Sequence, residues 1–406
     1  MGPIEIGLLL VGLILGPLIN FSIYSFAYFP RPISPWQLQP ESISKRNGNA
    51  KVPIVGWLFR REERIHFGPL FWLRPFLIEL ATPIAIVFLY GYCMVGTFSP
   101  GAVGLGTLRQ QFVGYALLIA LMTVATFIDF DERTIPDFIT IPGTIFGLVG
   151  ALIIPDWRLN ELVAIPPALV GIPIPLQANS PDPWNATWNG GFGLFLGLLF
   201  WSLWCFGMAD RRWITRRGLK KAVDYFFEVL RRSPSTRLLF GLWIAGVFAV
   251  TVAYIAVGPM RWEALLSSLF GIGLGGALVW GFRIVAQWAM GQEALGFGDV
   301  TLMAMIGSFF GWQIVWIAFF LAPFFGLIFV VIAWIVTRDN ATPFGPYLCA
   351  ATLYCMLDWV NTWGWCSSWF LPPHLLFPIF LGLLIALGAM LWLIQTIKFL
   401  LFGHAR

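Results

Sequence analysis

About ten long apolar stretches run through the chain, and they constrain its fold more than any other feature. Each is long enough, or nearly so, to cross a hydrocarbon core of ~30 Å as a helix of roughly 20 residues. Only 11% of the residues are charged, whereas a soluble domain has about 25%, so the chain cannot cover a water-facing surface of its size. The sequence therefore predicts an all-α, polytopic transmembrane helical bundle of about 9–10 spans. The approximate limits of the stretches are 5–29, 70–96, 110–128, 137–154, 191–209, 238–258, 264–287, 300–336 (one long span, or a short helix plus a span), 344–360 and 374–398.

Basic residues orient this bundle. Eight lie between Arg31 and Arg74 and nine between Arg211 and Arg237, and with alternating spans 22 of the 25 Lys and Arg residues fall on one face. Loops rich in Lys and Arg stay in the cytoplasm, so this face is predicted to be cytoplasmic. The first stretch has Glu5 but no preceding lysine and no small-residue cleavage site, which predicts a retained helix rather than a signal peptide.

The basic loop at 211–237 also has an amphipathic pattern. Apolar residues recur there at three- and four-residue spacing between lysines and arginines, at Leu219, Ala222, Val223, Phe226, Phe227 and Leu230. This pattern predicts a helix lying on anionic lipids at the membrane surface. Nucleic-acid binding is the competing interpretation of so much positive charge, and we disfavour it because the charge lies beside membrane spans.

Two carboxylates stand out because acids are scarce in the apolar stretches. Asp129 closes one stretch and Asp299 opens another, so both are predicted at the cytoplasmic edge of the bilayer although 170 residues separate them. Two carboxylates at one depth can perform aspartyl proteolysis: an ionised carboxylate takes a proton from water while its protonated partner polarises the scissile carbonyl. Gly296 and Gly298 leave room beside Asp299 for an extended substrate backbone.

The helix ends are expected to make the two acids unequal. Asp129 sits at a negative C-terminal end and Asp299 at a positive N-terminal end, so Asp299 is expected to carry most of the negative charge and Asp129 most of the proton. On the residues alone, other interpretations stay open. Asp299 could only cap its helix, and Asp129 could be one of several interfacial acids, with Asp131 its nearest rival and Asp137 better placed to start a helix.

Three segments carry more extended patterns. Residues 127–143 read FIDFDERTIPDFITIPG, residues 293–313 read EALGFGDVTLMAMIGSFFGWQ, and residues 343–351 read PFGPYLCAA. The first resembles the Asp-x5–6-Ile-Pro-Asp stretch of bacterial type IV prepilin peptidases, a family of GxGD-type aspartyl proteases, and the others resemble its Gly-x-Gly-Asp and Pro-Phe-Gly-Pro segments. The pattern Gly12-x3-Gly16-x3-Asn20 and residues 52–80 are similar to the family's opening helix and to the segment entering its second span. Gly-x-Gly-Asp alone is a weak signal, but the ordered set is strong.

The resemblance implies an activity, a location and residue roles. Members remove the basic leader of type IV prepilins or pseudopilins at the cytoplasmic face of the bacterial inner membrane, before the hydrophobic segment. Proteolysis needs no cofactor, but many members then methylate the new N-terminus with S-adenosylmethionine. The implied roles are catalytic for Asp129 and Asp299, supporting for Gly296, Gly298, Pro136 and Asp137, and attraction of the basic leader for Asp131 and Glu132.

The chain departs from the family pattern in three ways. Bifunctional members usually carry two cytoplasmic CxxC pairs, but residues 30–75 contain no cysteine, which excludes a thiolate zinc site and leaves methylation open. The Lys often found two residues after the second Asp is replaced by Thr301. Residues 155–260 add a Pro-rich outer loop, two spans and the basic loop, which we interpret as an inserted helical hairpin. The five cysteines form no CxxC pair and predict neither a metal site nor a disulfide framework: Cys93, Cys205, Cys349, Cys355 and Cys366.

The chain is accordingly divided into four regions. Residues 1–96 hold the N-terminal helix, the cysteine-free loop and the second span, a degenerate methyltransferase-like region. Residues 97–154 hold the first catalytic helix and the following span, and residues 155–260 the insertion. Residues 261–406 hold the Gly-x-Gly-Asp segment and the C-terminal spans.

Two other functions are alternatives. An intramembrane aspartyl protease with other substrates, of the signal-peptide-peptidase kind, usually has Tyr-Asp on its first catalytic helix, where this chain has Ile128-Asp129. A non-enzymatic transporter would place acids near mid-bilayer and show inverted internal repeats, and the sequence shows neither. Both alternatives are therefore disfavoured.

Overall fold

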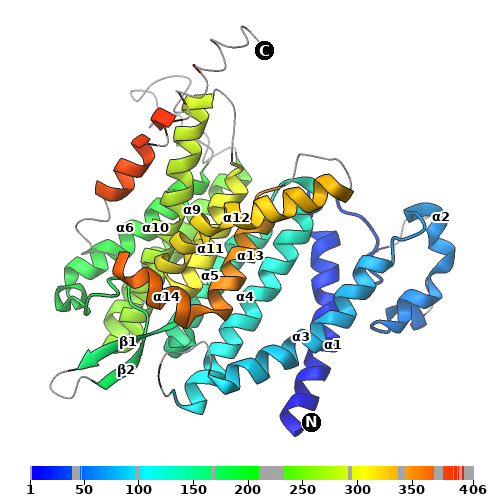
Figure 1. The fold of residues 1–406 in the computed structure, drawn as a ribbon, viewed down its shortest axis with the longest axis horizontal. Coiled ribbons are helices and arrows are strands. Elements are labelled where there is room, and N and C mark those ends of the chain that lie inside the picture. Colours follow the sequence, from blue (N-terminus) through cyan, green and yellow to red (C-terminus); the bar gives the residue numbers. More distant parts are fainter. Residues whose placement is uncertain are drawn as a thin grey trace.

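The structure, a computed structural model, consists almost entirely of helices (Figure 1). Seven of the described helices are long and apolar enough to cross a membrane, which confirms the predicted all-α polytopic fold. They are α1 (Pro3–Ser25), α3 (Leu73–Val95), α4 (Leu105–Glu132), α6 (Gly191–Met208), α9 (Pro234–Ala256), α10 (Pro259–Met290) and α12 (Trp312–Val336). The described residues are 2–38, 46, 48–96, 101, 103–165, 170–209, 228, 233–290, 295–336, 343–369, 378–386, 388–390, 392 and 396.

Shorter helices account for the remaining apolar stretches. They are α5 (Asp137–Ile153), α11 (Phe297–Phe310), α13 (Gly345–Leu357) and the helix Pro378–Met390. The small helix α2 (Arg64–Phe67) lies outside the apolar stretches, and α14 (Trp359–Cys366) begins at the end of one. With 14 and 13 residues, α11 and α13 are shorter than the roughly 20 residues of a full crossing. The predicted stretches are therefore helices, but not all of them are equal spans.

The predicted stretch at 300–336 consists of two helices. After Phe310, the last residue of α11, Gly311 has φ +90°, a left-handed conformation that favours glycine and ends the helix. The N–H of Gly311 donates to the carbonyl oxygen of Gly307 at 2.8 Å, and α12 begins at Trp312. Of the two sequence-based alternatives, the short helix plus a span is correct.

Helix α11 lies in the middle of the bundle (Figure 1). Every residue from Asp299 to Phe310 is buried, and α11 contacts α4, α5, α10, α12 and α13. It crosses α10 closely at Gly271 and Gly307, where a side chain on either glycine would overlap the backbone of the other. A helix enclosed on all sides cannot carry a charged face, and the one acid of α11, Asp299, stands in its first turn.

The segment after α5 closes one end of the bundle, which we call the hairpin end. Strands β1 (Asn160–Ile165) and β2 (Val170–Pro175) pair antiparallel over their full lengths, where the sequence predicted only a Pro-rich loop. Hydrogen bonds tie this segment to the helices. The indole N–H of Trp359 donates to the carbonyl oxygen of Asn160 at 2.8 Å, and that of Trp312 donates to the carbonyl oxygen of Ala178 at 2.6 Å.

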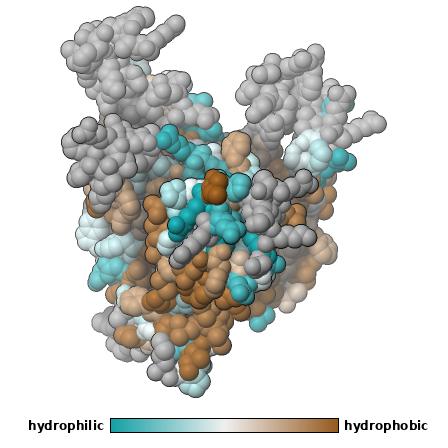
Figure 2. Space-filling model, turned by 90° about the vertical axis from the view of Figure 1, so that its right-hand side faces the viewer, coloured by the Kyte–Doolittle hydropathy of each residue, from teal (hydrophilic) through white to brown (hydrophobic). Residues whose placement is uncertain are grey.

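The side of the molecule that carries α1–α3 has separate hydrophobic and hydrophilic zones. Hydrophobic residues dominate the lower part of this face, and hydrophilic residues gather above them (Figure 2). Large apolar side chains on α1 and α3, including Ile14 and Ile84, are exposed, which is expected of a surface that faces lipid. The predicted membrane-surface helix at 211–237 falls mostly outside the described residues.

Candidate active site

Asp129 lies in the last turn of α4 and is buried. Its Oδ2 accepts a hydrogen bond of 3.1 Å from the backbone N–H of Gly345, the first residue of α13. The first N–H groups of a helix have no partner within the helix and favour negative charge, so the start of α13 suits a carboxylate. Helix α4 ends three residues later, and Arg133, in a left-handed conformation with φ +57°, turns the chain towards α5.

Asp299 lies in the first turn of α11 and is also buried. Its Oδ2 accepts the backbone N–H of Gly296, the N-cap residue, at 3.1 Å. The carboxylate therefore caps its own helix, which was one interpretation open from the sequence. Capping uses only this one oxygen, and the surroundings of Asp299 decide what else the side chain can do.

Ile135 connects the surroundings of the two acids. A Cβ on Gly298 would lie 2.9 Å from Cβ of Ile135, and a Cβ on Gly345 would lie 2.8 Å from its Cδ1. The Gly345 Cβ would also lie 2.5 Å from Oδ2 of Asp129. Ile135 therefore packs between the residue that precedes Asp299 and the residue that donates to Asp129.

Electrostatic contacts also join these acids, which we call the aspartate pair. Asp129 and Asp299 interact with each other, and both lie within electrostatic range of the Cys349 thiol in α13. Arg283 of α10 attracts Asp299, while its Nε donates to the carbonyl oxygen of Leu295 at 3.1 Å. The structure thus brings together, at one end of the bundle, two acids that are 170 residues apart in the sequence.

This arrangement has the parts that aspartyl proteolysis uses. Each carboxyl group is oriented by one backbone N–H on Oδ2. Among the described residues, Oδ1 of neither acid has a hydrogen-bond partner, so these oxygens are available to a water or to a carbonyl group. One ionised and one protonated carboxyl in this position can activate a water and polarise a peptide bond.

The acids next to Asp129 already have partners within the chain. Arg74 holds Asp131 with two hydrogen bonds of 2.8 and 2.7 Å, and Arg31 also pairs with Asp131. The carboxylate of Glu132 accepts the backbone N–H groups of residues 28 and 29 at 2.8 and 2.9 Å. Both acids therefore anchor the segment after α1 and the start of α3 against the end of α4.

The other sequence-predicted residues lie at helix starts. Pro136 is the N-cap of α5, with its carbonyl oxygen accepting the N–H of Ile139 at 3.0 Å, and Asp137 is the first helical residue. Thr301 donates its hydroxyl to the carbonyl oxygen of Gly298 at 3.1 Å, within the first turn of α11. Pro136 and Asp137 thus fix the start of α5, directly after Ile135.

Buried side chains, rather than thiols, organise the loop between α1 and α3. Glu63 accepts hydrogen bonds from Arg46 at 3.0 and 2.9 Å and from Arg60 at 2.8 and 2.5 Å, and we call these three residues the arginine–glutamate cluster. Burial would raise the pKa of Glu63, but the hydrogen bonds and charges of Arg60 and Arg46 outweigh burial and lower it. Among the described residues, no group of three or more His, Cys, Asp or Glu side chains could hold a metal ion.

Glu79 gives the N-terminal glycine pattern a structural explanation. Its Oε1 accepts Nδ2 of Asn20 at 3.1 Å, and its Oε2 accepts the backbone N–H of Ile54 at 2.6 Å. A Cβ on Gly16 would lie 2.9 Å from Cα of Glu79, so α1 packs directly on α3 at this level. Glu79 therefore joins α1, the loop and α3.

Three parts of the site were not predicted from the sequence: the Gly345 N–H, the packing of Ile135 and the charge of Arg283. Gly345 belongs to the quoted PFGPYLCAA segment, which marked the region without giving it a role. Ile135 lies inside the quoted FIDFDERTIPDFITIPG segment, but an apolar residue gives no chemical signal. Arg283 is a single charge near the end of an apolar stretch, and only the packing of α10 beside α11 reveals its partner.

Comparisons with known proteins agree with the resemblance seen in the sequence. Residues 231–331 match the model of the type IV leader peptidase family. The match contains Asp299 but not Asp129, and it begins within the segment interpreted as an insertion, so that α9 lies inside it. No solved structure matches the chain.

Several curated relatives are similar over part of their length. A prepilin leader peptidase/N-methyltransferase of Pseudomonas putida is 30% identical over 134 residues, which is 32% of this chain and 42% of that protein. The Pseudomonas aeruginosa protein of the same description is 33% identical over 124 residues, 27% of this chain and 41% of that protein. Leader peptidase HopD of Escherichia coli is 33% identical over 93 residues, 22% of this chain and 57% of that protein. The chain thus covers less than two thirds of each of these relatives.

Proposed function

We propose that the chain is a membrane-embedded aspartyl endopeptidase that cleaves the basic leader peptide of type IV prepilins or pseudopilins. The cut would be made at the cytoplasmic face of the bacterial inner membrane, where the basic loops are predicted to lie. The observation that carries the proposal is the meeting of Asp129 and Asp299 across Ile135, in buried positions at the ends of two helices. The match of residues 231–331 to the type IV leader peptidase family supports it.

The proposed reaction is direct hydrolysis by the aspartate pair. The ionised carboxylate takes a proton from a water between the two Oδ1 atoms, and the water oxygen attacks the scissile carbonyl carbon. The protonated partner donates a hydrogen bond to the carbonyl oxygen and then its proton, so that a tetrahedral intermediate forms. The carboxyl that took the proton from water gives it to the leaving amine, and the C–N bond breaks. The leader leaves with a new C-terminal carboxyl group, whose proton returns to the other carboxylate. Each carboxyl accepts a backbone N–H at the start of a helix, so the two share one proton as a pair and either member can be the ionised one.

Methylation of the new N-terminus would be a second activity, with S-adenosylmethionine as the methyl donor. The names of several relatives include this activity, and the sequence leaves it open for this chain. Both buried acids of the N-terminal region are engaged, Glu63 by two arginines and Glu79 by Asn20 and the Ile54 N–H. Neither of these acids is therefore free to bind the methyl donor. Anionic lipids at 211–237 and attraction of the leader by Asp131 and Glu132 remain predictions from the sequence.

Mass spectrometry of a prepilin co-expressed with the enzyme tests the proposal. We expect the wild type to remove the leader, and D129N and D299N to leave it intact while remaining folded and inserted. Asp182, exposed on the hairpin end, provides the matched control, and D182N should process normally. Normal processing by either active-site variant would refute the assignment. An added methyl mass on the product would show that methylation occurs without the cysteines.

A further inference from the structure

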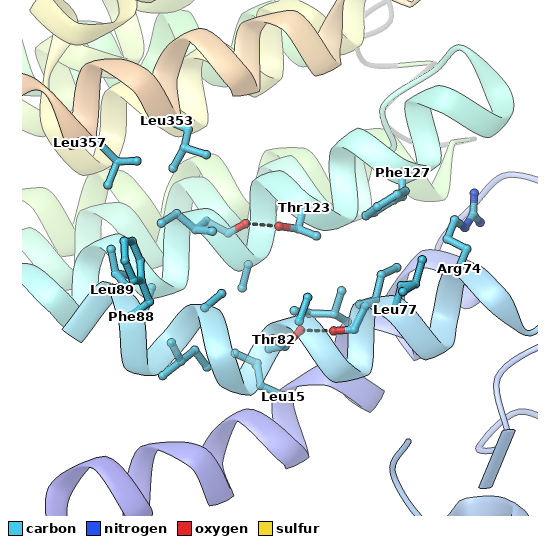
Figure 3. Close-up of a pocket in the computed structure, with 18 of the residues that line it drawn as sticks. Leu15, Arg74, Leu77, Thr82, Phe88, Leu89, Thr123, Phe127, Leu353 and Leu357 are labelled. Carbon is cyan, nitrogen blue, oxygen red and sulfur yellow. Dashed lines mark hydrogen bonds between the residues drawn. The ribbon is translucent and has the colours of Figure 1, made fainter. Parts of the chain in front are cut away.

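An apolar groove opens between α3 and α4 (Figure 3). Its volume is about 620 Å³, and residues of α1 and α13 complete its walls. It runs from Arg74 and Phe127 at one end to Phe88 and Leu357 at the other. Along α3, the residues from Arg74 to Leu89 span about 22 Å, which is most of the thickness of a bilayer core.

The groove offers an occupant almost no polar group. The hydroxyl of Thr82 donates to the carbonyl oxygen of Ile78 at 2.6 Å, and that of Thr123 donates to the carbonyl oxygen of Ile119 at 2.7 Å, so both are satisfied within their own helices (Figure 3). Arg74, at one end, is held by Asp131. The chemistry of the groove therefore fits an uncharged apolar segment.

The walls favour a helix over a lipid chain. They include alanines spaced four residues apart, Ala81 and Ala85 on α3 and Ala116 and Ala120 on α4. Small residues with this spacing let another helix approach the backbone closely in a membrane, whereas a flexible acyl chain does not require them. Leu80, which is 39% exposed on α3, does not line the groove and lies about 100° around the helix from Ala81.

Helix α4 connects the groove with the candidate active site. Phe127 lines the end of the groove, and Asp129 follows two residues later, at nearly the same level along the helix axis. The two side chains lie roughly 160° apart around α4, which is about 14 Å along the helix surface. Phe130, 43% exposed, lies between them on one side. An extended stretch of about four residues passing Phe130 would bridge this distance.

We propose that this groove receives the apolar transmembrane helix of the substrate. The helix would lie with its first turn at the Arg74 end, and the extended residues before it would cross Phe130 to present the scissile bond to Asp129 and Asp299. This inference rests on the proposed function, because a prepilin places its cleavage site directly before its apolar segment. It adds the surface by which the enzyme holds the membrane-embedded part of that substrate.

Filling the groove tests the proposal. Tryptophan at Ala81 occupies the groove, whereas tryptophan at Leu80, which lies about 100° around α3 from Ala81 and does not line the groove, serves as the matched control. We expect A81W to lower kcat/KM for a full-length prepilin at least tenfold, with L80W close to wild type. Both variants should cleave a synthetic peptide, containing the leader but not the apolar helix, at the slow wild-type rate. Full-length cleavage by A81W at the wild-type rate would overturn the groove and leave the proposed function standing.

Photo-crosslinking tests where the substrate helix binds without depending on enzyme activity. In the D299N background, a photoreactive amino acid at position 81 should form an adduct with uncleaved prepilin, and one at position 80 should give only background. Adducts with lipid alone at position 81, or equal prepilin adducts at both positions, would overturn the proposal. If the wild type cleaves neither the prepilin nor the peptide, the proposed function fails and the groove assignment falls with it.

Discussion

Replacing Gly345 by Ala tests whether the position of Asp129 controls the chemistry. The added methyl group would lie 2.5 Å from Oδ2 of Asp129, whereas ordinary contacts begin at 3.4 Å, so the carboxylate must move by about 1 Å. Ile135, whose Cδ1 would lie 2.8 Å away, blocks part of the space into which the backbone could relax. A displacement of about 1 Å at a reacting group can cost about 10²-fold in rate. Gly345 is the first residue of α13 and does not have a positive φ, so alanine adds no backbone strain.

We expect G345A to lower kcat for prepilin cleavage about 100-fold with little change in KM, since the substrate helix would still bind. Initial rates on a purified prepilin measure this effect. The matched control is G364A in α14, where an added methyl group meets nothing within 4 Å. Overpacking could lower stability by about 1–3 kcal/mol, so the unfolding temperature of both variants is measured beside the rates. A folded G345A enzyme with kcat within twofold of wild type would refute the catalytic role of the Asp129 position.

Two further predictions concern buried acids away from the aspartate pair. In E63Q, Arg46 and Arg60 would remain buried without their counter-charge, and we expect the free energy of unfolding to fall by about 3–5 kcal/mol. The loss would be measured as faster proteolysis of the loop between α1 and α3, and unchanged proteolysis would contradict the prediction. Because the pKa of Glu63 is lowered, its stabilisation is present above the unfolded carboxyl pKa of about 4.3 and is lost as the pH falls through the lower folded value. At the hairpin end, burial raises the pKa of Glu161 to about 7, so the wild type should lose about 3 kcal/mol of stability between roughly pH 4.5 and pH 7. E161Q should flatten that part of the pH profile, and an equally steep profile in the variant would exclude Glu161 as its cause.

The helices could be predicted from the sequence because hydropathy is a local property. A run of apolar residues in a membrane must form a helix to satisfy its own backbone, whatever lies next to it. The predicted stretch 70–96 therefore corresponds to α3 (Leu73–Val95), and 137–154 to α5 (Asp137–Ile153). The positions of Asp129 and Asp299 at helix ends follow from the same boundaries. That the two acids lie close together depends on how the helices pack, and this was expected only from the family resemblance.

The strands at the hairpin end could not be predicted in this way. β2 contains Pro173 and Pro175, and proline lacks the N–H that a central strand needs, so the segment resembles a loop. In a two-stranded sheet each strand has a free edge, and proline is tolerated when its nitrogen faces that edge. The hairpin also depends on partners distant in the sequence, such as the Trp359 indole that donates to Asn160. No local pattern contains that information.

The partners of the acids around Asp129 also could not be predicted from the sequence. The sequence treats Asp131 as a free acid beside the site, because Arg74 is 57 residues away in the chain. The structure pairs them, so that an interfacial acid becomes a link between α3 and α4. The attraction of a basic leader to Asp131 would therefore compete with two arginines that already neutralise it. A count of acids along the sequence therefore overestimates the negative charge that is available to a binding partner.

The cysteine-free loop is held together by charged side chains. Ser34 stands near the place where the family resemblance would put the first CxxC pair. Arg46 donates to the carbonyl oxygens of Pro32 and Ser34 at 2.7 and 2.8 Å and also to Glu63, so one guanidinium joins this place to the next part of the loop. A buried ion pair adds little net stability, because desolvation offsets most of the attraction, but it tolerates few alternative arrangements. The arginine–glutamate cluster therefore fixes the path of the loop above α1 and α3 more than it stabilises the fold, and it does so with residues that need no metal.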